Sequence, residues 1–112
     1  MLARHLAGPV TTAQEEILRY LVRRGNVTGV RGGDLVDYYL SRREARDRAH
    51  AEKTGQRHFP GHHATGRLHS WRRNGGLQLR RMREAGLLRE RGISHGTPLY
   101  DVTAEGFDAI AE

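Results

Sequence analysis

Arginine and side-chain amide groups are concentrated between residues 72 and 83, in a segment with a helical apolar repeat. Arginine can form two hydrogen bonds to guanine O6 and N7, and asparagine or glutamine can form the equivalent pair with adenine N6 and N7. If Leu79 and Met82 face a core, the polar residues of the same helix point away from it. The segment therefore supplies candidate DNA contacts at Arg72, Arg73, Asn74, Gln78, Arg80 and Arg81.

A second group of candidate DNA contacts lies just downstream. Arg89 and Arg91 alternate with Glu90, so they would share one face of a strand. His95 falls in the turn that follows, and the tip of a hairpin can touch the phosphate backbone or enter the minor groove. Because most protein–DNA hydrogen bonds go to phosphate and sugar, we expect at least half of the arginines to contact phosphate.

Histidines are crowded between residues 58 and 69, at His58, His62, His63 and His69, which suggests metal binding. Zinc sites need three or four converging ligands with partners that orient them. The chain has no cysteine, no carboxylate occurs between residues 53 and 83, and Pro60-Gly61 is typical of a loop. We therefore expect no metal site and no cofactor. These histidines are interpreted as polar loop residues or additional DNA contacts.

Catalysis is not expected either. Adjacent histidines near arginines suggest a nuclease or phosphotransferase, but no Asp/Glu pair accompanies them to hold magnesium. The chain also lacks a G-x-S-x-G motif, a P-loop and the motifs of kinases. The sequence thus favours a binding protein over an enzyme.

The charge of the chain is concentrated over the candidate contacts. The 112 residues are enough for one domain with a modest core, and the formal net charge is +6. Residues 57–91 hold nine arginines and only two acidic residues. Such a block is expected of a protein that binds a polyphosphate. The alternatives are a solvated basic surface or the arginine bias of a GC-rich genome, since Lys53 is the sole lysine.

Several classes of protein are excluded by what the sequence lacks. The absence of cysteine rules out disulfides, thiolate zinc sites and a cysteine nucleophile. No apolar run approaches the length of a membrane span, and the first ten residues lack the apolar segment of a signal peptide. We therefore expect a cytoplasmic protein without a membrane partner, nucleoid-associated when bound to DNA.

Two helices are predicted in the first half of the chain. A capping box over Thr12–Glu15 precedes an apolar stripe from Ile17 to Val22. Asp34 is placed to cap the second helix. Beyond residue 40 the apolar stripe fails but helix formers continue, so this helix is expected to extend as an exposed arm to about Glu52.

The second half is expected to hold two further helices. One continuous helix over residues 65–85 would place Gly75 and Gly76 in its interior, each costing about 1 kcal/mol relative to alanine. We therefore predict two helices, 64–73 and 77–85, joined by a three-residue turn. Trp71 is expected in the core against Leu79, the alternative being a partly exposed contact.

A β-hairpin and a last short helix are predicted after Gly86. The turn is expected over Gly92–Thr97 and the returning strand over Pro98–Val102, where apolar and polar residues alternate. Thr103 is placed to cap the final helix, with Phe107 and Ile110 on one face.

This order of helix, hinge, basic hairpin and short helix resembles the winged helix-turn-helix domains of prokaryotic transcription regulators such as the MarR and PadR groups. The resemblance covers about a third of the chain and is carried by Leu79, Met82, Ala85-Gly86-Leu87-Leu88, Leu99-Tyr100, Val102-Thr103 and Gly106. It implies a recognition helix ending near Ala85, a wing over residues 88–102 and double-stranded DNA as the ligand. It also implies a short strand over residues 26–31 that pairs with residues 98–102.

The main departure from that family pattern is a basic insertion at residues 41–63, flexible or helical, where only a few residues usually join the second helix to the recognition helix. The insertion could be disordered, become ordered on DNA or pack against a second subunit. A homodimer formed through this arm or through residues 1–10 is left open.

The sequence therefore predicts a single domain over residues 1–112, mainly α with a small β-hairpin, as a winged helix-turn-helix with a three-helix core plus wing. The expected function is sequence-specific binding of double-stranded DNA by a bacterial or phage transcription regulator, with no small-molecule ligand. Two alternatives are an RNA-binding or ribosome-associated winged helix and a phage-type protein-interaction module anchored by Tyr38, Tyr39 and Trp71.

Overall fold

The computed structural model describes residues 10–55 and 65–111, which form a mainly helical fold with one two-stranded antiparallel sheet. The predicted combination of helices with a small hairpin is thereby confirmed. The elements are α2 (Thr12–Arg23), the 3-10 helix η1 (Gly32–Leu35), α3 (Val36–Thr54), α4 (Thr65–Glu84), β1 (Leu88–Ser94), β2 (Thr97–Val102) and α5 (Ala104–Ile110).

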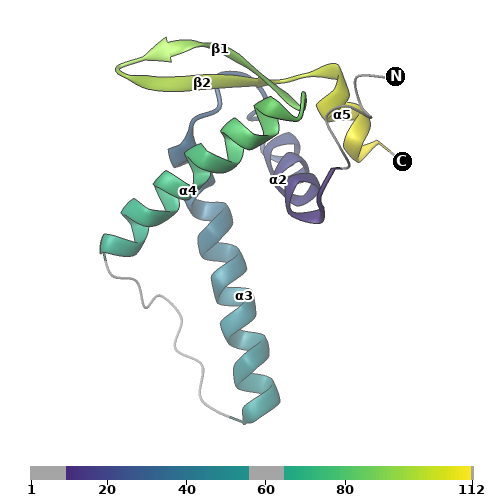
Figure 1. The fold of residues 1–112 in the computed structure, drawn as a ribbon. Helices are drawn as coiled ribbons and strands as arrows, with labels where there is room; N and C mark the ends of the chain where they lie inside the picture. The colour runs from purple at the N-terminus through teal and green to yellow at the C-terminus, as the bar shows by residue number, and fades with distance from the viewer. Residues whose placement is uncertain (1–9, 56–64, 112) are drawn as a thin grey trace.

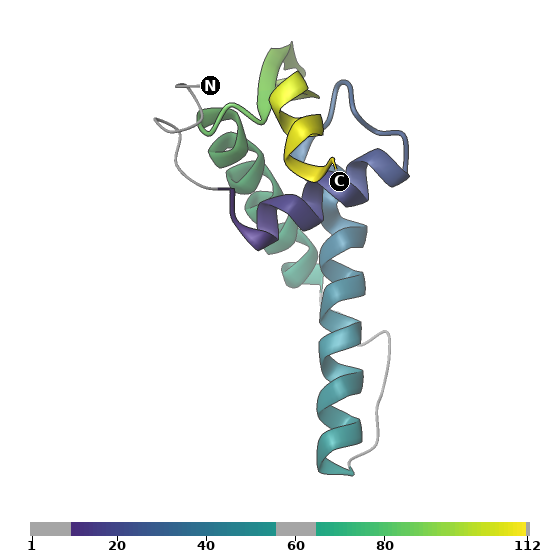
Figure 2. The same cartoon turned by 90° about the vertical axis from the view of Figure 1, so that its right-hand side faces the viewer.

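The helix α3 projects from the rest of the fold (Figure 1, Figure 2). It packs beside η1 and α4. Its later turns extend away from α2, α5 and the hairpin, which lie together at the other end of the molecule (Figure 1). The fold therefore consists of a body built from α2, α4, α5 and the hairpin, with α3 as an arm.

Apolar side chains from most elements of the body meet in one core. Ile17, Leu18 and Leu21 line one side of α2, and Leu79 and Met82 of α4 have no exposed surface. Burying a side chain of this size contributes about 1.5–3 kcal/mol relative to leaving it exposed. The remaining buried members of the core are Val30, Leu35, Tyr38, Leu87, Leu88 and Tyr100. This core fixes which side of α4 faces outward.

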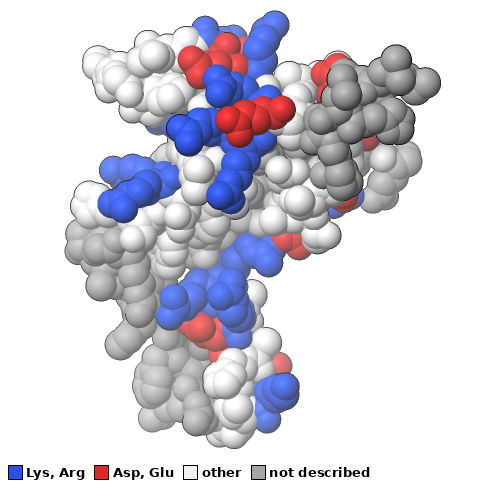
Figure 3. Space-filling view, viewed as in Figure 1, with Lys and Arg blue, Asp and Glu red and all other residues white. Residues whose placement is uncertain are grey.

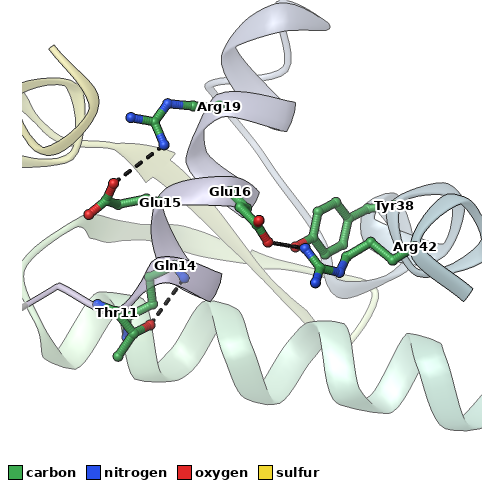
Figure 4. A network of polar contacts seen from close by, with 7 residues as sticks. All are labelled: Thr11, Gln14, Glu15, Glu16, Arg19, Tyr38 and Arg42. Carbon is green, nitrogen blue, oxygen red and sulfur yellow. Dashed lines mark hydrogen bonds and ion pairs between the residues drawn. The ribbon is translucent and has the colours of Figure 1, made fainter. Parts of the chain in front are cut away.

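The cap of α2 lies one residue before the predicted capping box. Thr11 is the cap: its Oγ1 accepts from the Gln14 backbone N–H at 3.1 Å, and the Gln14 side chain accepts from the Thr11 N–H at 3.1 Å (Figure 4). The predicted pair of Thr12 and Glu15 was wrong, because Glu15 instead pairs with Arg19 one turn later at 3.3 Å. Because Thr11 and Thr12 are adjacent, and Gln14 and Glu15 follow each of them by three residues, the sequence fits a capping box that begins at either threonine.

The start of the second helical segment also differs from the prediction. Asp34 does not cap α3; it is the third residue of η1. Its carboxylate accepts from the Arg31 N–H at 2.9 Å and from Asn26 Nδ2 at 3.2 Å. Because η1 runs directly into α3, the N–H groups that begin α3 follow helical residues and need no separate cap.

The helix α3 continues as the exposed arm that the sequence predicted, ending at Thr54 before Gly55, whose φ is 72°. It is joined to α2 by a polar cluster in which Glu16 pairs with Arg42 and accepts from the Tyr38 hydroxyl at 3.4 Å (Figure 4). Of the predicted insertion 41–63, the part up to Gly55 is thus almost entirely helical, and the rest lies outside the described residues.

The short strand implied over residues 26–31 is present as a single bridge. The backbones of Val30 and Tyr100 exchange two hydrogen bonds, of 2.8 and 3.0 Å. The Val102 N–H also donates to the Val27 carbonyl at 2.8 Å. The pairing with the returning strand is therefore confirmed, and it ties the loop after α2 to the hairpin.

Residues 65–84 form one helix, so the predicted division at Asn74-Gly75-Gly76 was wrong. The reason is a tertiary contact: a Cβ on Gly75 would overlap the carbonyl oxygen of Gly32. A Cβ on Gly32 would lie 2.6 Å from the backbone nitrogen of Gly76. The glycines let η1 and α4 touch backbone to backbone, and this contact offsets their low helix propensity.

Trp71 is half-buried and lies outside the core, contrary to the prediction. At 3.6 residues per turn, it falls at the edge of the buried face that Gly75, Leu79 and Met82 define. That edge borders a groove between α3 and α4, which Trp71 lines.

The hairpin turns more tightly than predicted. The strands β1 and β2 are joined by His95 and Gly96 alone, whose φ angles of 52° and 78° fit a two-residue turn with both central residues left-handed. The predicted six-residue turn was therefore too long. The register shifts between Glu90 and Gly92, which leaves Arg91 as the extra residue of a bulge.

Thr103 caps α5 as predicted, with its Oγ1 accepting from the Gly106 N–H at 3.0 Å. Phe107 is 41% exposed, whereas Ile110 packs against the core, so these two do not share a buried face. The buried residue of α5 is Gly106. It packs so closely against the backbone of Leu87 that a Cβ at this position would overlap the Leu87 carbonyl oxygen.

Replacing Gly75 by alanine should destabilise the fold, although alanine is the better helix former. The added Cβ must push α4 away from η1, and overpacking of this kind costs about 1–3 kcal/mol. Gly76→Ala is the matched control, since nothing lies within 4 Å of a Cβ built there. It should gain up to about 1 kcal/mol from helix propensity. Urea unfolding followed by circular dichroism measures both free energies, and equal effects would contradict the backbone contact.

Candidate nucleic-acid interface

The exposed side of α4 carries most of the candidate contacts in that segment. Leu79 and Met82 are completely buried, and the helical repeat turns the polar residues between and around them outward. Gln78 is half-buried at the edge that faces α3. The other predicted contacts of this helix are exposed, as expected: Arg72, Arg73, Asn74, Arg80 and Arg81.

Four arginines on this helix have no acidic partner among the described residues: Arg72, Arg73, Arg80 and Arg81. The nearest acidic residue of β1, Glu90, pairs with a different arginine, Arg83, at 3.4 Å. One acidic side chain, Glu84, is exposed at the C-terminal end of α4. The exposed side of α4 therefore keeps a strong net positive charge that attracts anions.

A groove of about 520 Å³ is lined by residues of η1, of the middle of α4 and of β2. The Arg72 side chain borders it and lies over Gly33. Arg31, on the opposite wall, pairs with Asp34 at 3.7 Å and stays exposed. Gly32 and Gly76, which belong to the close backbone contact between η1 and α4, are among the residues that line this groove. Arg31 was not among the predicted contacts, since nothing in its local sequence links it to α4.

The hairpin arginines share one strand face, as predicted, and both approach Asp101. Arg91 Nε lies 3.0 Å from one carboxylate oxygen of Asp101, and an Arg89 guanidinium nitrogen lies 3.7 Å from the other. Their side chains remain 54% and 77% exposed. One carboxylate thus holds two cations in place while leaving them open to a ligand.

The hydrogen bond that the Gly29 N–H donates at 2.9 Å is the main reason why the pKa of Asp101 lies below its usual value. Burial opposes this shift, whereas the Arg91 hydrogen bond and the charges of Arg91 and Arg89 reinforce it. Asp101 is only 8% exposed, so its ionised form depends on these partners. The same contacts connect the loop after α2 to both strands of the hairpin.

The tip of the hairpin presents His95, as predicted, and an apolar residue that sequence reasoning missed. Ile93 is 68% exposed. Its neighbours in sequence are a glycine and a serine, so no apolar alternation marked it as unusual. On α4, Leu77 is the comparable exposed apolar residue, at 39%. An apolar side chain among cations can contact a thymine methyl group or a sugar.

The basic side chains of α4, the hairpin and α3 appear on one face of the molecule. Figure 3 shows blue atoms over all three elements, with red atoms fewer and mostly beside them. A surface of this extent matches the size of a polyanion better than that of a small ligand.

The histidine cluster yields no metal site in the part of the chain that the structure describes. No three His, Cys, Asp or Glu side chains converge there. His69 is exposed, and His58, His62 and His63 lie outside the described residues.

None of the described helices combines the length and apolar character needed to cross a bilayer.

The residues suggested as anchors for a protein partner are poorly placed for that role. Tyr38 is buried, with its ring packed edge-on against those of Tyr20 and Tyr39 at centroid distances of 5.3 and 5.4 Å. Tyr39 and Trp71 are half-buried.

Comparisons with protein-family models, curated proteins and solved structures find no match for this chain.

Replacing Asp101 by asparagine should make the stability of the fold less dependent on pH. The folded-state pKa of Asp101 is lowered, so its ionised form contributes stability above the ordinary range of aspartate, and this contribution is lost as pH falls through the lowered value. At pH 7 we expect the variant to be less stable by about 1.5–3 kcal/mol, the contribution of a hydrogen bond to a charged group.

Urea unfolding between pH 7 and pH 2.5 measures this effect, with Glu84→Gln as the control at an exposed position on α4. The gap between Asp101→Asn and the wild type should narrow toward acid pH. A gap of constant size would show that the Asp101 charge adds nothing to stability.

Proposed function

We propose that this protein is a winged helix-turn-helix protein that binds double-stranded DNA and regulates transcription. The observation that carries the proposal is the exposed side of α4, where Arg72, Arg73, Arg80 and Arg81 have no acidic partner among the described residues. The opposite side of the helix is anchored by Leu79 and Met82, both fully buried. A rigid helix with cations on one side is what insertion into the major groove requires.

The order and pairing of the elements support this proposal. Helices α2, α3 and α4 precede a hairpin, and the isolated bridge from Val30 to Tyr100 pairs the loop after α2 with β2. In this arrangement α4 would be the recognition helix and β1–β2 the wing. The long arm of α3 is an addition to that plan.

The contacts divide into two kinds. Asn74 and Gln78 would hydrogen-bond to base edges in the major groove, and Arg80 and Arg81 would each contact a base edge or a phosphate beside it. Each good pair with a base contributes about 1–3 kcal/mol of discrimination. Arg89 and Arg91 would grip the flanking phosphates, and His95 would reach the backbone or minor groove from the hairpin tip. Regulation would follow from occupancy, because a bound protein changes access to the promoter.

Replacing Arg80 and Arg81 together by glutamine should weaken binding to a duplex selected from a random pool by roughly tenfold or more. The salt dependence should become shallower, with the slope of log affinity against log salt reduced by up to about 1.8, because each lost phosphate contact releases about 0.9 fewer counterions. Fluorescence anisotropy across a salt series measures both quantities.

Arg23→Gln/Arg24→Gln is the matched control, since it removes the same charge from two exposed residues on and just after α2. It should leave affinity and slope nearly unchanged. Equal loss in the two double variants would mean that only net charge matters. Equal competition by duplex RNA would favour an RNA ligand instead, because the A-form major groove is too narrow for a helix.

A further inference from the structure

The projecting helix α3 carries a stripe of basic residues that the proposed site does not use. Arg42, Arg46 and Lys53 are separated by four and seven residues, which places them on one side of a helix. His50 and Arg43 flank this side. We call these five residues the arm stripe. Glu44 and Glu52 fall away from the stripe, and Asp47 lies at its border.

Within the arm stripe, the ion pairs are formed by the two residues nearest the body of the fold. Arg42 pairs with Glu16, and Arg43 pairs with Asp47 at 3.2 Å. Among the described residues, no acidic side chain pairs with Arg46 or Lys53. The outer part of the arm stripe thus presents two available cations, on a helix that few other elements touch.

The base of the arm stripe faces α4. A groove of about 220 Å³ between the two helices is lined by Arg42, Arg43 and Arg46 from α3 and by Trp71 and Gln78 from α4. The side of α4 next to this groove carries Asn74 and Arg81. Figure 3 shows the basic side chains of α4 and α3 in the same view. The two sets of cations therefore belong to one surface.

We propose that the arm stripe is a second contact with the same DNA duplex, following the sugar-phosphate backbone beyond the segment held by α4. This inference rests on the proposed function and adds to it a backbone contact that does not depend on base sequence. The two available cations, Arg46 and Lys53, lie about 10 Å apart along the helix axis, which corresponds to about three base pairs along the duplex. Cations at that spacing suit a line of phosphates.

The first test compares two duplexes that share one selected site, the longer extended by ten base pairs on each side. The wild type should bind the longer duplex more tightly, by roughly fivefold at low salt. Arg46→Gln/Lys53→Gln should lose this advantage and keep its affinity for the short duplex. Arg23→Gln/Arg48→Gln, which removes the same charge away from the stripe, should retain the advantage.

The outcomes separate this inference from the proposed function. If the wild type binds both duplexes equally, or if the arm variant weakens both to the same degree, the arm contact is wrong and the α4 site stands. If the wild type binds neither duplex, both fail. Gln is a good helix former and both positions are exposed, so circular dichroism should show unchanged helix content in each variant.

The second test uses the absence of cysteine from the chain. Lys53→Cys provides a single thiol, to which an iron–EDTA group can be attached to cut nearby DNA. We expect strand cleavage in the extension of the long duplex, outside the segment cut by the same group at Arg80→Cys. Cleavage from position 80 without any from position 53 would overturn the proposed contact.

Discussion

The backbone contact between Gly32 and Gly75 determines how the rest of this fold is arranged. Two chain segments can approach so closely only where neither has a Cβ, and here a side chain at either position would collide with backbone atoms of the other segment. The contact sets the position of α4 against η1, and η1 continues into α3. Gly32 also lines the groove that Arg31 and Arg72 border. The placement of the basic side chains of α3 and α4 thus depends on the absence of a side chain at Gly32 and at Gly75.

Asp101 plays a comparable part in the hairpin. Its buried carboxylate accepts from the Gly29 backbone and attracts Arg89 and Arg91, so one anion connects the loop, the two strands and the cations on them. Around Asp101, two guanidinium groups meet one carboxylate, which leaves a local excess of positive charge there, although Glu90 makes the hairpin as a whole formally neutral. The structural requirement and the proposed binding of an anion are therefore compatible at the same position.

Local patterns in the sequence were enough to predict α2, the long α3, α5, the presence of a hairpin and the outward side of residues 72–82. Periodic apolar residues such as Leu79 and Met82 report directly which face is buried. The predictions failed where a distant contact decides. Helix propensity alone argued for a break at Gly75, since its partner Gly32 lies far away in sequence. Trp71 was expected in the core because of its size, and the arm stripe was hidden among the alternating charges of residues 42–53.

The central claim is that the exposed side of α4 and the hairpin face a DNA duplex. Amide chemical-shift mapping by NMR, with labelled protein and a selected duplex, tests it residue by residue. We expect the largest shifts at residues 72–81 and 89–97, with small changes in α2 and α5. Shifts concentrated on α2 and α5, with those of α4 unmoved, would contradict the claim.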